Sequence, residues 1–282
     1  MVRVWSLPMT VSLVLLGGAY ANFMGMRTDL YALTLAVIAA LLLHSGANIL
    51  NDVNDVSRGI DAPDSPTAIY REHPVLKGLI SRSYAMKLSW VIVASGLLLG
   101  AYVSYITGPA VFLLELAGAI LLASYNGPLA NMKAIGLGEF EVSLIWGPLL
   151  VLGGFAASAK GALTFNILLV SILPGMIMMS LIYANNHRDI ASDSRAGVKS
   201  FAYRTQKYGN LIFSSCLFAP YALEVVYVIF RIIPAFAFLT LLTLPYAIKI
   251  QRMFKRGALD IDSREGTLFT IYNLLLIAAV LI

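Results

Sequence analysis

Long apolar runs alternate with short polar connections along the whole chain. A helix needs about 18 or more mostly apolar residues to cross a hydrocarbon core of about 30 Å. Runs of this kind occupy residues 4–24, 30–50, 84–106, 108–124, 137–157, 164–187, 209–231, 232–250 and 264–282. The pattern predicts an all-α polytopic membrane protein, a bundle of nine transmembrane helices forming a single domain over residues 1–282.

Composition supports this fold class. Apolar residues make up 59% of the 282 positions and charged residues only 12%, which is too apolar for a soluble domain. The first run contains Ala19-Tyr20-Ala21, which resembles a signal-peptidase site, but its basic flank is weak and Pro8 interrupts it. We therefore expect a retained helix. Cys216, the single cysteine, lies inside an apolar run and is expected to pack rather than react.

The distribution of basic residues predicts the orientation in the membrane. With nine spans and the N-terminus inside, all Lys and Arg residues except Arg27, Lys160 and Arg231 fall on the inner side. The positive-inside rule then predicts a multi-pass protein of the cell membrane, with cytoplasmic N-terminus and polar loops and an external C-terminus. The net charge of +5 suits anionic lipid headgroups of the bilayer and gives no reason to expect nucleic acid as a partner.

A cluster of oxygen-bearing side chains ends the second run. If its helix continues far enough, Asn48, Asp52 and Asp55 fall at i, i+4 and i+7 on one face. Asn51 then lies beside Asp55. Carboxylate and amide oxygens are ligands of Mg²⁺, which keeps coordination positions open for substrate phosphates. The alternative is that these residues only cap a helix and solvate a loop.

Two polar connections are expected on the same side of the membrane. The first, residues 56–82, is about 27 residues long and too long for an idle turn; Lys77 within it could face an anion. The second offers Tyr125, Asn126 and Lys133 near the level of the first cluster, among helix-breaking Gly and Pro residues. The alternatives are a solvated basic loop for the first connection and glycines that serve helix packing for the second.

A second polar cluster ends the sixth run, where Asn185, Asp189 and Asp193 are spaced i, i+4 and i+8. Helices four spans apart run in the same direction, so both clusters should reach one membrane surface and flank one polar pocket. The recurrence suggests an internal duplication, about 1–124 and 137–250, followed by a last helix 264–282.

Other polar residues in the apolar runs carry weaker signals. An acidic residue within a membrane span is a functional candidate, yet we expect structural hydrogen-bonding roles for Glu115 and Glu224. We interpret His187 as a polar boundary residue. His44, one turn before Asn48, is the more interesting of the two, and the alternative is that it only bonds a neighbouring helix. Neither histidine has metal-ligand spacing, and the sequence contains no Cys/His constellation and no glycine-rich nucleotide loop.

Two acidic clusters with bases nearby would hold a diphosphate through bridging Mg²⁺ and neutralise its charge as it leaves. Diphosphate departure is useful when the other product is a stabilised cation, as an allylic prenyl chain provides. The apolar tail of a prenyl chain explains why the protein would lie in a membrane. The prenyl cation would need aromatic faces and exclusion of water until an electron-rich acceptor ring attacks it.

These residues resemble the UbiA-type intramembrane aromatic prenyltransferases over nearly the whole chain. The motifs are Asn48-x2-Asn51-Asp52-x2-Asp55, Pro74-Val75-Leu76-Lys77-Gly78-Leu79-Ile80-Ser81 and Asp189-x3-Asp193. Within the family the chain is most similar to the 1,4-dihydroxy-2-naphthoate prenyltransferases of menaquinone biosynthesis. The features of that similarity are Asp55-x3-Gly59-x-Asp61, Arg3 with Leu7-Pro8, Gly136-Leu137-Gly138-Glu139, and Asn185-Asn186-x-Arg188-Asp189 before Ala196-Gly197.

The resemblance implies a nine-helix bundle with a central cavity near the cytoplasmic face and Mg²⁺-dependent transfer of a polyprenyl group from its diphosphate to an aromatic ring. It assigns a first metal site to Asn48, Asn51, Asp52, Asp55 and Asp61 and a second to Asp189 and Asp193. Asp52, Asp55, Asp189, Asp193, Lys199 and Tyr125 are the catalytic candidates, with Tyr125 on the acceptor or cation side. Substrate-binding candidates are Asn48, Arg58, Lys77, Lys133, Arg188 and Arg204, and Lys199 also belongs on the diphosphate side.

Val198 and His73 depart from the family pattern, where a base and an Arg or Gly are usual, and this leaves the acceptor open. The alternatives are 4-hydroxybenzoate, a glycerol phosphate ether lipid precursor or haem as acceptor, and Mn²⁺ in place of Mg²⁺. A different class, an ion or organic-anion transporter with paired acidic sites, is disfavoured because transporter sites usually lie near the midplane of the bilayer. Nothing in the sequence indicates an obligate protein partner.

Overall fold

The computed structural model describes residues 1–63, 65–70, 72–125 and 130–282, so Asn126 lies outside the described residues. Within these ranges the chain is helical and contains no strand, which confirms the all-α class. Its elements in chain order are η1 (Val4–Ser6), α1 (Leu7–Phe23), α2 (Leu30–Ser57), α3 (Pro66–Tyr70), α4 (Arg82–Thr107), α5 (Pro109–Tyr125), α6 (Gly138–Leu144), η2 (Ile145–Leu149), α7 (Leu150–Ser158), α8 (Phe165–Arg188), α9 (Ile190–Arg195), α10 (Phe201–Arg204), η3 (Gln206–Tyr208), α11 (Gly209–Ile229), η4 (Ala235–Thr243), α12 (Leu244–Lys255) and α13 (Ile261–Leu281).

Seven helical stretches in the described part of the chain are long and apolar enough to cross a membrane. They are Val4–Phe23, Leu30–Ser57, Arg82–Thr107, Gly138–Ser158, Phe165–Arg188, Gln206–Ile229 and Ile261–Leu281. The two other predicted spans correspond to α5, an apolar helix of 17 residues, and to the 3-10 helix η4 continued by α12. The chain is therefore a membrane protein, and the count of nine crossings stays a prediction.

Helix α2 carries the first acidic cluster because it runs without a break for 28 residues. Asp29 caps its N-terminus by accepting a hydrogen bond from the Ala32 amide, which satisfies one of the unpaired donors of the first turn. The helix ends at Ser57, and Gly59 follows with a φ of 70°, a left-handed conformation that favours glycine. The predicted continuation of this helix to Asp55 is confirmed.

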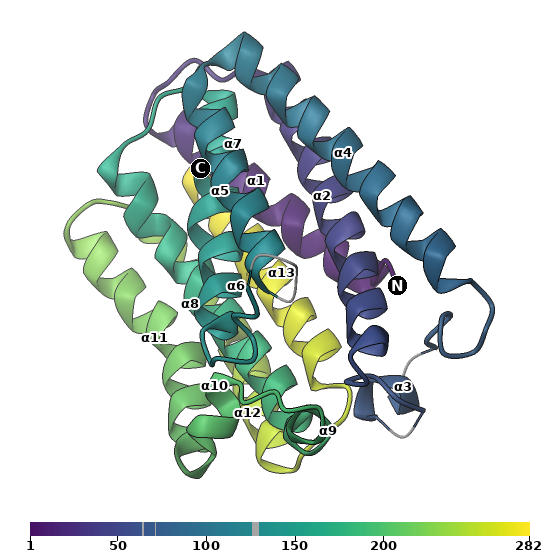
Figure 1. The fold of residues 1–282 in the computed structure, drawn as a ribbon. Helices are drawn as coiled ribbons and strands as arrows, with labels where there is room; N and C mark the ends of the chain where they lie inside the picture. The colour runs from purple at the N-terminus through teal and green to yellow at the C-terminus, as the bar shows by residue number, and fades with distance from the viewer. Residues whose placement is uncertain (64, 71, 126–129) are drawn as a thin grey trace.

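Helix α1 lies in the interior of the bundle and packs against α2, α7 and α13, as Figure 1 shows. Its contact with α7 depends on glycines: a Cβ on Gly17 would lie 2.2 Å from the Val151 carbonyl oxygen, and one on Gly154 only 2.1 Å from that of Val14. Such close approach of backbones is typical of helix packing in membranes. Helices α2 and α4 lie side by side at one edge of the bundle, and α11 lies at the opposite edge.

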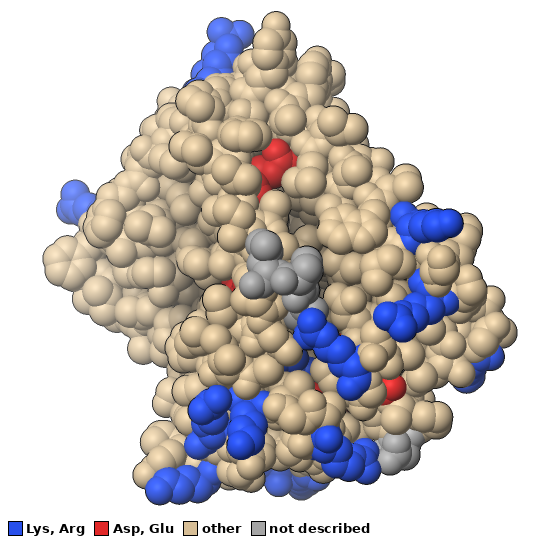
Figure 2. All heavy atoms as spheres, in the orientation of Figure 1, with Lys and Arg blue, Asp and Glu red and all other residues tan. Residues whose placement is uncertain are grey.

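Basic side chains gather toward one end of the molecule. In Figure 2 most of the visible Lys and Arg residues surround the lower part, where α3, α9, α10 and α12 lie in Figure 1, and the broad middle is largely free of charge. This arrangement agrees with an apolar belt bounded by a basic surface. Both acidic clusters end at this basic side, because α2 and α8 finish there.

Candidate active site

A cavity of about 410 Å³ lies between α1, α2, α4, α5, α8 and the neighbouring turns. Its polar end is lined by residues of both acidic clusters together with connecting segments. The polar residues of this end are Arg3, Asn48, Asn51, Asn54, Asp55, Asp61, Tyr125, Lys133, Asn185, Arg188, Asp189, Ser192, Asp193 and Asp262. The shared pocket expected from helix direction is therefore present, and it contains most of the predicted site residues.

The first acidic cluster enters the cavity through the last turns of α2 and the turn that follows. Asn51 donates a hydrogen bond from Nδ2 to Asp55 Oδ2 over 3.0 Å. The amides of Ile60 and Asp61 both donate to the Asp55 carbonyl, at 2.9 and 3.2 Å. This turn places the backbone of Asp61 beside the helix end, so that the carboxyl groups of Asp55 and Asp61 both line the cavity.

Asp52 does not line the cavity with Asn48 and Asp55, although the spacing predicted one shared face. Its carboxylate is fully buried, accepts a hydrogen bond from Arg3 Nη2 over 2.9 Å and lies 4.0 Å from His73 Nε2. Three residues advance a helix by about 300°, so Asp52 lies about 60° around α2 from Asp55. That angle turns Asp52 toward the N-terminal segment and away from the cavity.

The second acidic cluster is organised by Arg188, the last residue of α8. Its guanidinium donates from Nε and Nη2 to the two oxygens of Asp189, at 2.9 and 2.8 Å. It also contacts Asn185 and lies 3.3 Å from Asp262 Oδ2 at the start of α13. Arg188 was predicted to bind substrate, and these contacts show that much of its hydrogen-bonding capacity goes to holding Asp189 in place.

Lys133 connects the α5–α6 segment to the second cluster. Its Nζ lies 3.1 Å from Asp193 Oδ1, and both side chains are buried. Burial alone would lower the pKa of Lys133, but the carboxylates of Asp193 and Asp55 raise it above its usual value. Burial raises the pKa of Asp193, and the charge of Lys133 opposes that shift. The polar end of the cavity thus contains a charged lysine among several carboxyl groups.

The oxygen atoms of this end fit a hard divalent cation. Asp193 Oδ2 and Asn51 Oδ1 are buried and have no hydrogen-bond partner among the described residues, and both residues line the cavity. A buried acceptor without a partner costs free energy, and a cation between the clusters would remove that cost. Carboxylate and amide oxygens are the ligands that Mg²⁺ prefers, so the residues present fit this metal.

Four of the predicted basic residues are not in the cavity wall. Arg58 is exposed just past the end of α2, and Lys77 is exposed and pairs with Glu72 over 2.8 Å. Lys199 and Arg204 are also exposed, and Arg204 Nε donates to the Lys199 carbonyl over 3.0 Å. Tyr125, in contrast, lies in the wall next to Lys133, whose amide donates to its carbonyl.

The remainder of the cavity is apolar and extends between the transmembrane helices. One stripe on α4 (Trp90, Val93, Leu97, Gly100 and Val103) faces another on α5 (Val111, Leu114, Gly118, Ala119 and Leu122). Glu115 also lines this part, with its carboxyl group so close to Gly100 that a Cβ there would lie 2.0 Å from Oε1. We expected a structural role for Glu115, and the structure places it on the cavity wall. Figure 2 shows an acidic group at the surface in the upper middle of the view, where the surrounding atoms are uncharged.

Several cavity residues were missed by sequence reasoning. Asp262 lies near the start of the last helix. The sequence predicted that this end of the helix lies on the inner side of the membrane, and an acidic residue at that level could have been recognised as a further site candidate. Trp5 and Trp146 line the cavity from η1 and η2, and nothing in the sequence distinguishes them from packing residues. Trp146 meets the His44 ring edge-on at 4.4 Å, and His44 contacts the hydroxyl groups of Ser6 and Thr10 at 3.2 and 2.8 Å.

Comparison with known proteins agrees with this geometry. Residues 7–274 match the model of the UbiA prenyltransferase family. The chain belongs to this family. Membership of the UbiA prenyltransferase family makes it a membrane-embedded prenyltransferase, as the resemblance of its motifs implied.

Relatives in the UbiA family differ in what their names state. "UbiA prenyltransferase domain-containing protein 1" of Danio rerio is 26% identical over 263 residues, covering 90% of this chain and 74% of the relative. The 1,4-dihydroxy-2-naphthoate octaprenyltransferase of Escherichia coli (strain K12) is 29% identical over 219 residues, covering 75% of this chain and 69% of the relative.

Solved structures of UbiA homologues share the fold. The apo structure of a homologue from Aeropyrum pernix K1 superposes with a TM-score of 0.76 at 18% identity, covering 99% of this chain and 98% of the other. A homologue from Archaeoglobus fulgidus bound to GPP and Mg²⁺ gives a TM-score of 0.58 at 16% identity, covering 99% and 100%. At these identities the comparison shows a common fold.

Proposed function

We propose that the protein is a Mg²⁺-dependent prenyltransferase that moves a polyprenyl group from an allylic diphosphate to 1,4-dihydroxy-2-naphthoate, with loss of the carboxylate of the acceptor. The observation that carries this proposal is one cavity with two acidic clusters and Lys133 at its polar end and a long apolar wall beyond them. A diphosphate fits the first part and an isoprenoid tail fits the second. Structural neighbours bound to GPP or DMAPP with Mg²⁺ support this assignment.

The polar end would bind the diphosphate through opposite charges. Asn51, Asp55 and Asp61 from one side and Asp189 and Asp193 from the other would hold Mg²⁺. The metal, when bound, would neutralise the diphosphate and stabilise it as a leaving group. Lys133 adds a fixed positive charge to the same end, and Tyr125 beside it offers a hydroxyl group to acceptor or phosphate.

The protein's contribution to the prenyl transfer is placement and exclusion of water. As the C–O bond of the donor breaks, the diphosphate leaves with the electron pair and the prenyl carbon becomes cationic. The rings of Trp5 and Trp146 in the wall supply aromatic faces that can stabilise this charge. A carbon of the electron-rich acceptor ring then forms the new bond, and loss of CO₂ returns the electrons of the broken C–C bond to the ring.

The naphthoate acceptor is favoured by one relative and by the sequence motifs. The E. coli relative acts on 1,4-dihydroxy-2-naphthoate by its name. A structural neighbour described as a digeranylgeranylglyceryl phosphate synthase, with a TM-score of 0.59 at 17% identity, keeps a lipid phosphate acceptor as the second candidate. Both candidates use the same donor chemistry, and the cytoplasmic orientation predicted from the basic residues would place the polar end where soluble substrates arrive.

The deciding experiment uses the purified protein reconstituted in lipid with Mg²⁺, geranylgeranyl diphosphate and 1,4-dihydroxy-2-naphthoate. We expect mass spectrometry to detect the decarboxylated prenyl naphthoquinol, or the quinone to which air oxidises it during work-up, and a chelator to abolish both. Diphosphate release without this product would reject the acceptor and keep the donor site. Ion flux in liposomes with no diphosphate release would favour the transporter alternative.

A further inference from the structure

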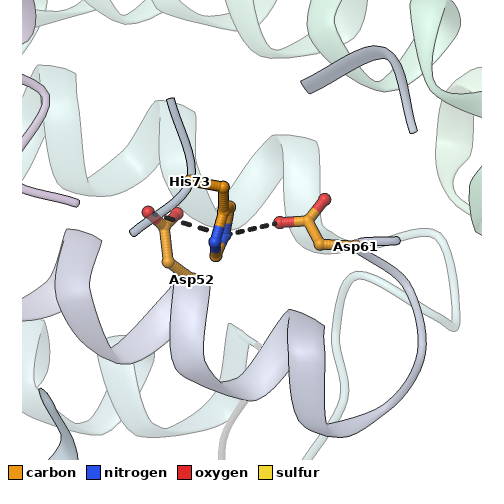
Figure 3. Close-up of side chains that lie close together, drawn as sticks. All are labelled: Asp52, Asp61 and His73. Carbon is orange, nitrogen blue, oxygen red and sulfur yellow. Dashed lines mark ion pairs between the residues drawn. The ribbon is translucent and has the colours of Figure 1, made fainter. Parts of the chain in front are cut away.

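His73 is buried between two carboxyl groups of the first acidic cluster. Its Nε2 lies 3.4 Å from Asp61 Oδ2 and 4.0 Å from Asp52 Oδ2, and the residue is only 2% exposed. Figure 3 shows the ring pointing between the two carboxyl groups, which approach it from opposite sides. The sequence motifs marked His73 only as a departure from the family pattern.

The proton on the ring is directed at the carboxyl groups. The Leu76 amide donates a hydrogen bond to Nδ1 over 3.4 Å, so Nδ1 acts as the acceptor and Nε2 carries the hydrogen. Nε2 is buried and has no regular hydrogen-bond partner among the described residues. Its nearest acidic oxygen belongs to Asp61, toward which a small movement of either group would complete a bond.

A packed turn brings His73 to this place. The amides of Lys77 and Leu79 donate to the carbonyls of His73 and Pro74, at 3.1 and 2.9 Å. Val75 and Ile80 in the same turn pack against buried apolar residues of α2 and α4. The turn is therefore fixed to α2 by apolar contacts that do not involve the carboxyl groups.

Asp61 needs such a partner more than Asp55 does. Asp55 is part of α2 and receives a hydrogen bond from Asn51. Asp61 follows the left-handed Gly59, and the hydrogen bond from its amide to the Asp55 carbonyl fixes only its backbone. Its carboxyl group borders the cavity, with Oδ2 turned to His73.

We propose that His73 is a positioning residue for the metal site: through Nε2–H it holds Oδ2 of Asp61, so that Oδ1 is presented to the cation. The inference rests on the proposed Mg²⁺-dependent function. Carboxylates that bind metals are commonly oriented by such outer hydrogen bonds, and loss of one typically costs 10- to 100-fold in metal affinity or activity. A direct metal–His73 bond would need Nε2 without its hydrogen, whereas the Leu76 amide donates to Nδ1 and leaves the hydrogen on Nε2.

Two substitutions of His73 separate positioning from folding. In His73→Asn the shorter amide can still accept the Leu76 hydrogen bond but cannot reach Asp61. In His73→Gln the side-chain amide reaches about as far as Nε2 and can donate to Asp61. Val75→Ala is the matched control, because it weakens packing of the same turn and leaves the contact with Asp61 in place.

The test measures Mn²⁺ binding to the purified, lipid-reconstituted protein by electron paramagnetic resonance, and the Mg²⁺ concentration that gives half-maximal diphosphate release. We expect His73→Asn to weaken both by about 10- to 100-fold, His73→Gln to recover most of the loss, and Val75→Ala to match the unaltered protein. Unchanged Mn²⁺ binding in His73→Asn, or an equal loss in Val75→Ala, would overturn the role of His73.

The same measurements distinguish this inference from the proposed function. If the unaltered protein binds Mn²⁺ and only His73→Asn loses affinity, the positioning role stands even when no prenyl product forms. If prenyl product forms and all variants respond equally to Mg²⁺, the proposed function stands and the role of His73 is wrong. Stronger Mn²⁺ binding in His73→Asn would also contradict the role.

Discussion

At the scale of single residues, the site depends on which carboxyl groups face the cavity. Asp55 and Asp193 line it, and Asp52 of the same motif is turned to Arg3 and His73. The family resemblance assigned Asp52 and Asp55 to a first metal site and Asp193 to a second. The structure gives Asp52 a different environment from the other two. A substitution of Asp52 should therefore first disturb its contacts with Arg3 and His73, and should affect metal binding only through them.

Replacing Asp55 or Asp193 by Asn should nearly abolish diphosphate release. Each change replaces a carboxylate that would hold Mg²⁺ by a neutral amide and so would weaken the stabilisation of the leaving diphosphate. Loss of one group that stabilises developing charge commonly lowers kcat by about 10²- to 10³-fold. Release of diphosphate from geranylgeranyl diphosphate is the measurement. Asp260→Asn is the control, because Asp260 belongs to an exposed pair with Arg264; substantial activity in both cavity variants would reject the two-cluster site.

At the scale of elements, residues 133–139 and residues 193–202 are held together at the polar end of the cavity. The Lys199 amide donates to the Ala134 carbonyl, and Lys133 pairs with Asp193. The carboxylate of Glu139 accepts hydrogen bonds from the amides of Phe201 and Ala202, at 3.3 and 3.0 Å. Glu139 therefore caps α10 from another part of the chain, a role that its position in the Gly136–Glu139 motif did not reveal.

Glu139→Ala should loosen the segment that follows Asp193. The change leaves two amides of α10 without their charged acceptor, and hydrogen bonds to charged groups contribute about 1.5–3 kcal/mol each. Faster trypsin cleavage after Lys199 and Arg204 is the expected result. Glu72→Ala, which removes an exposed partner of Lys77, should leave these cleavage rates unchanged; equal rates in Glu139→Ala would show that the cap has no effect.

At the scale of the whole molecule, the cavity joins a charged end to a long apolar wall between α4 and α5. Gly100 of α4 and Glu115 of α5 leave little free space along this wall, because the carboxyl group of Glu115 lies directly against the backbone of Gly100. A donor whose tail follows this wall would pass the pair only if the tail is long. Under the proposed function, we therefore expect the arrangement of α4 and α5 to make turnover depend on the chain length of the donor.

Gly100→Leu should impair long donors more than short ones. The new side chain would displace the Glu115 carboxyl group and fill apolar space, and overpacking of this kind typically costs about 1–3 kcal/mol. We expect kcat/KM for geranylgeranyl diphosphate to fall by about tenfold or more, with a smaller change for dimethylallyl diphosphate. Leu98→Phe, on the exposed side of α4, is the control. An equal fall for both donors would exclude this path for the tail.

The sequence by itself determined the helical class, the membrane location and the two acidic clusters, because long apolar runs and helical spacing are local properties of the chain. It also predicted the meeting of the clusters, since helix direction follows from the number of spans between them. Tertiary structure alone decided that Asp52 turns away from Asp55, that Asp262 and Trp146 line the cavity, and that His73 lies between two carboxyl groups. These outcomes depend on helix rotation and on contacts between residues far apart in sequence, which no local pattern records.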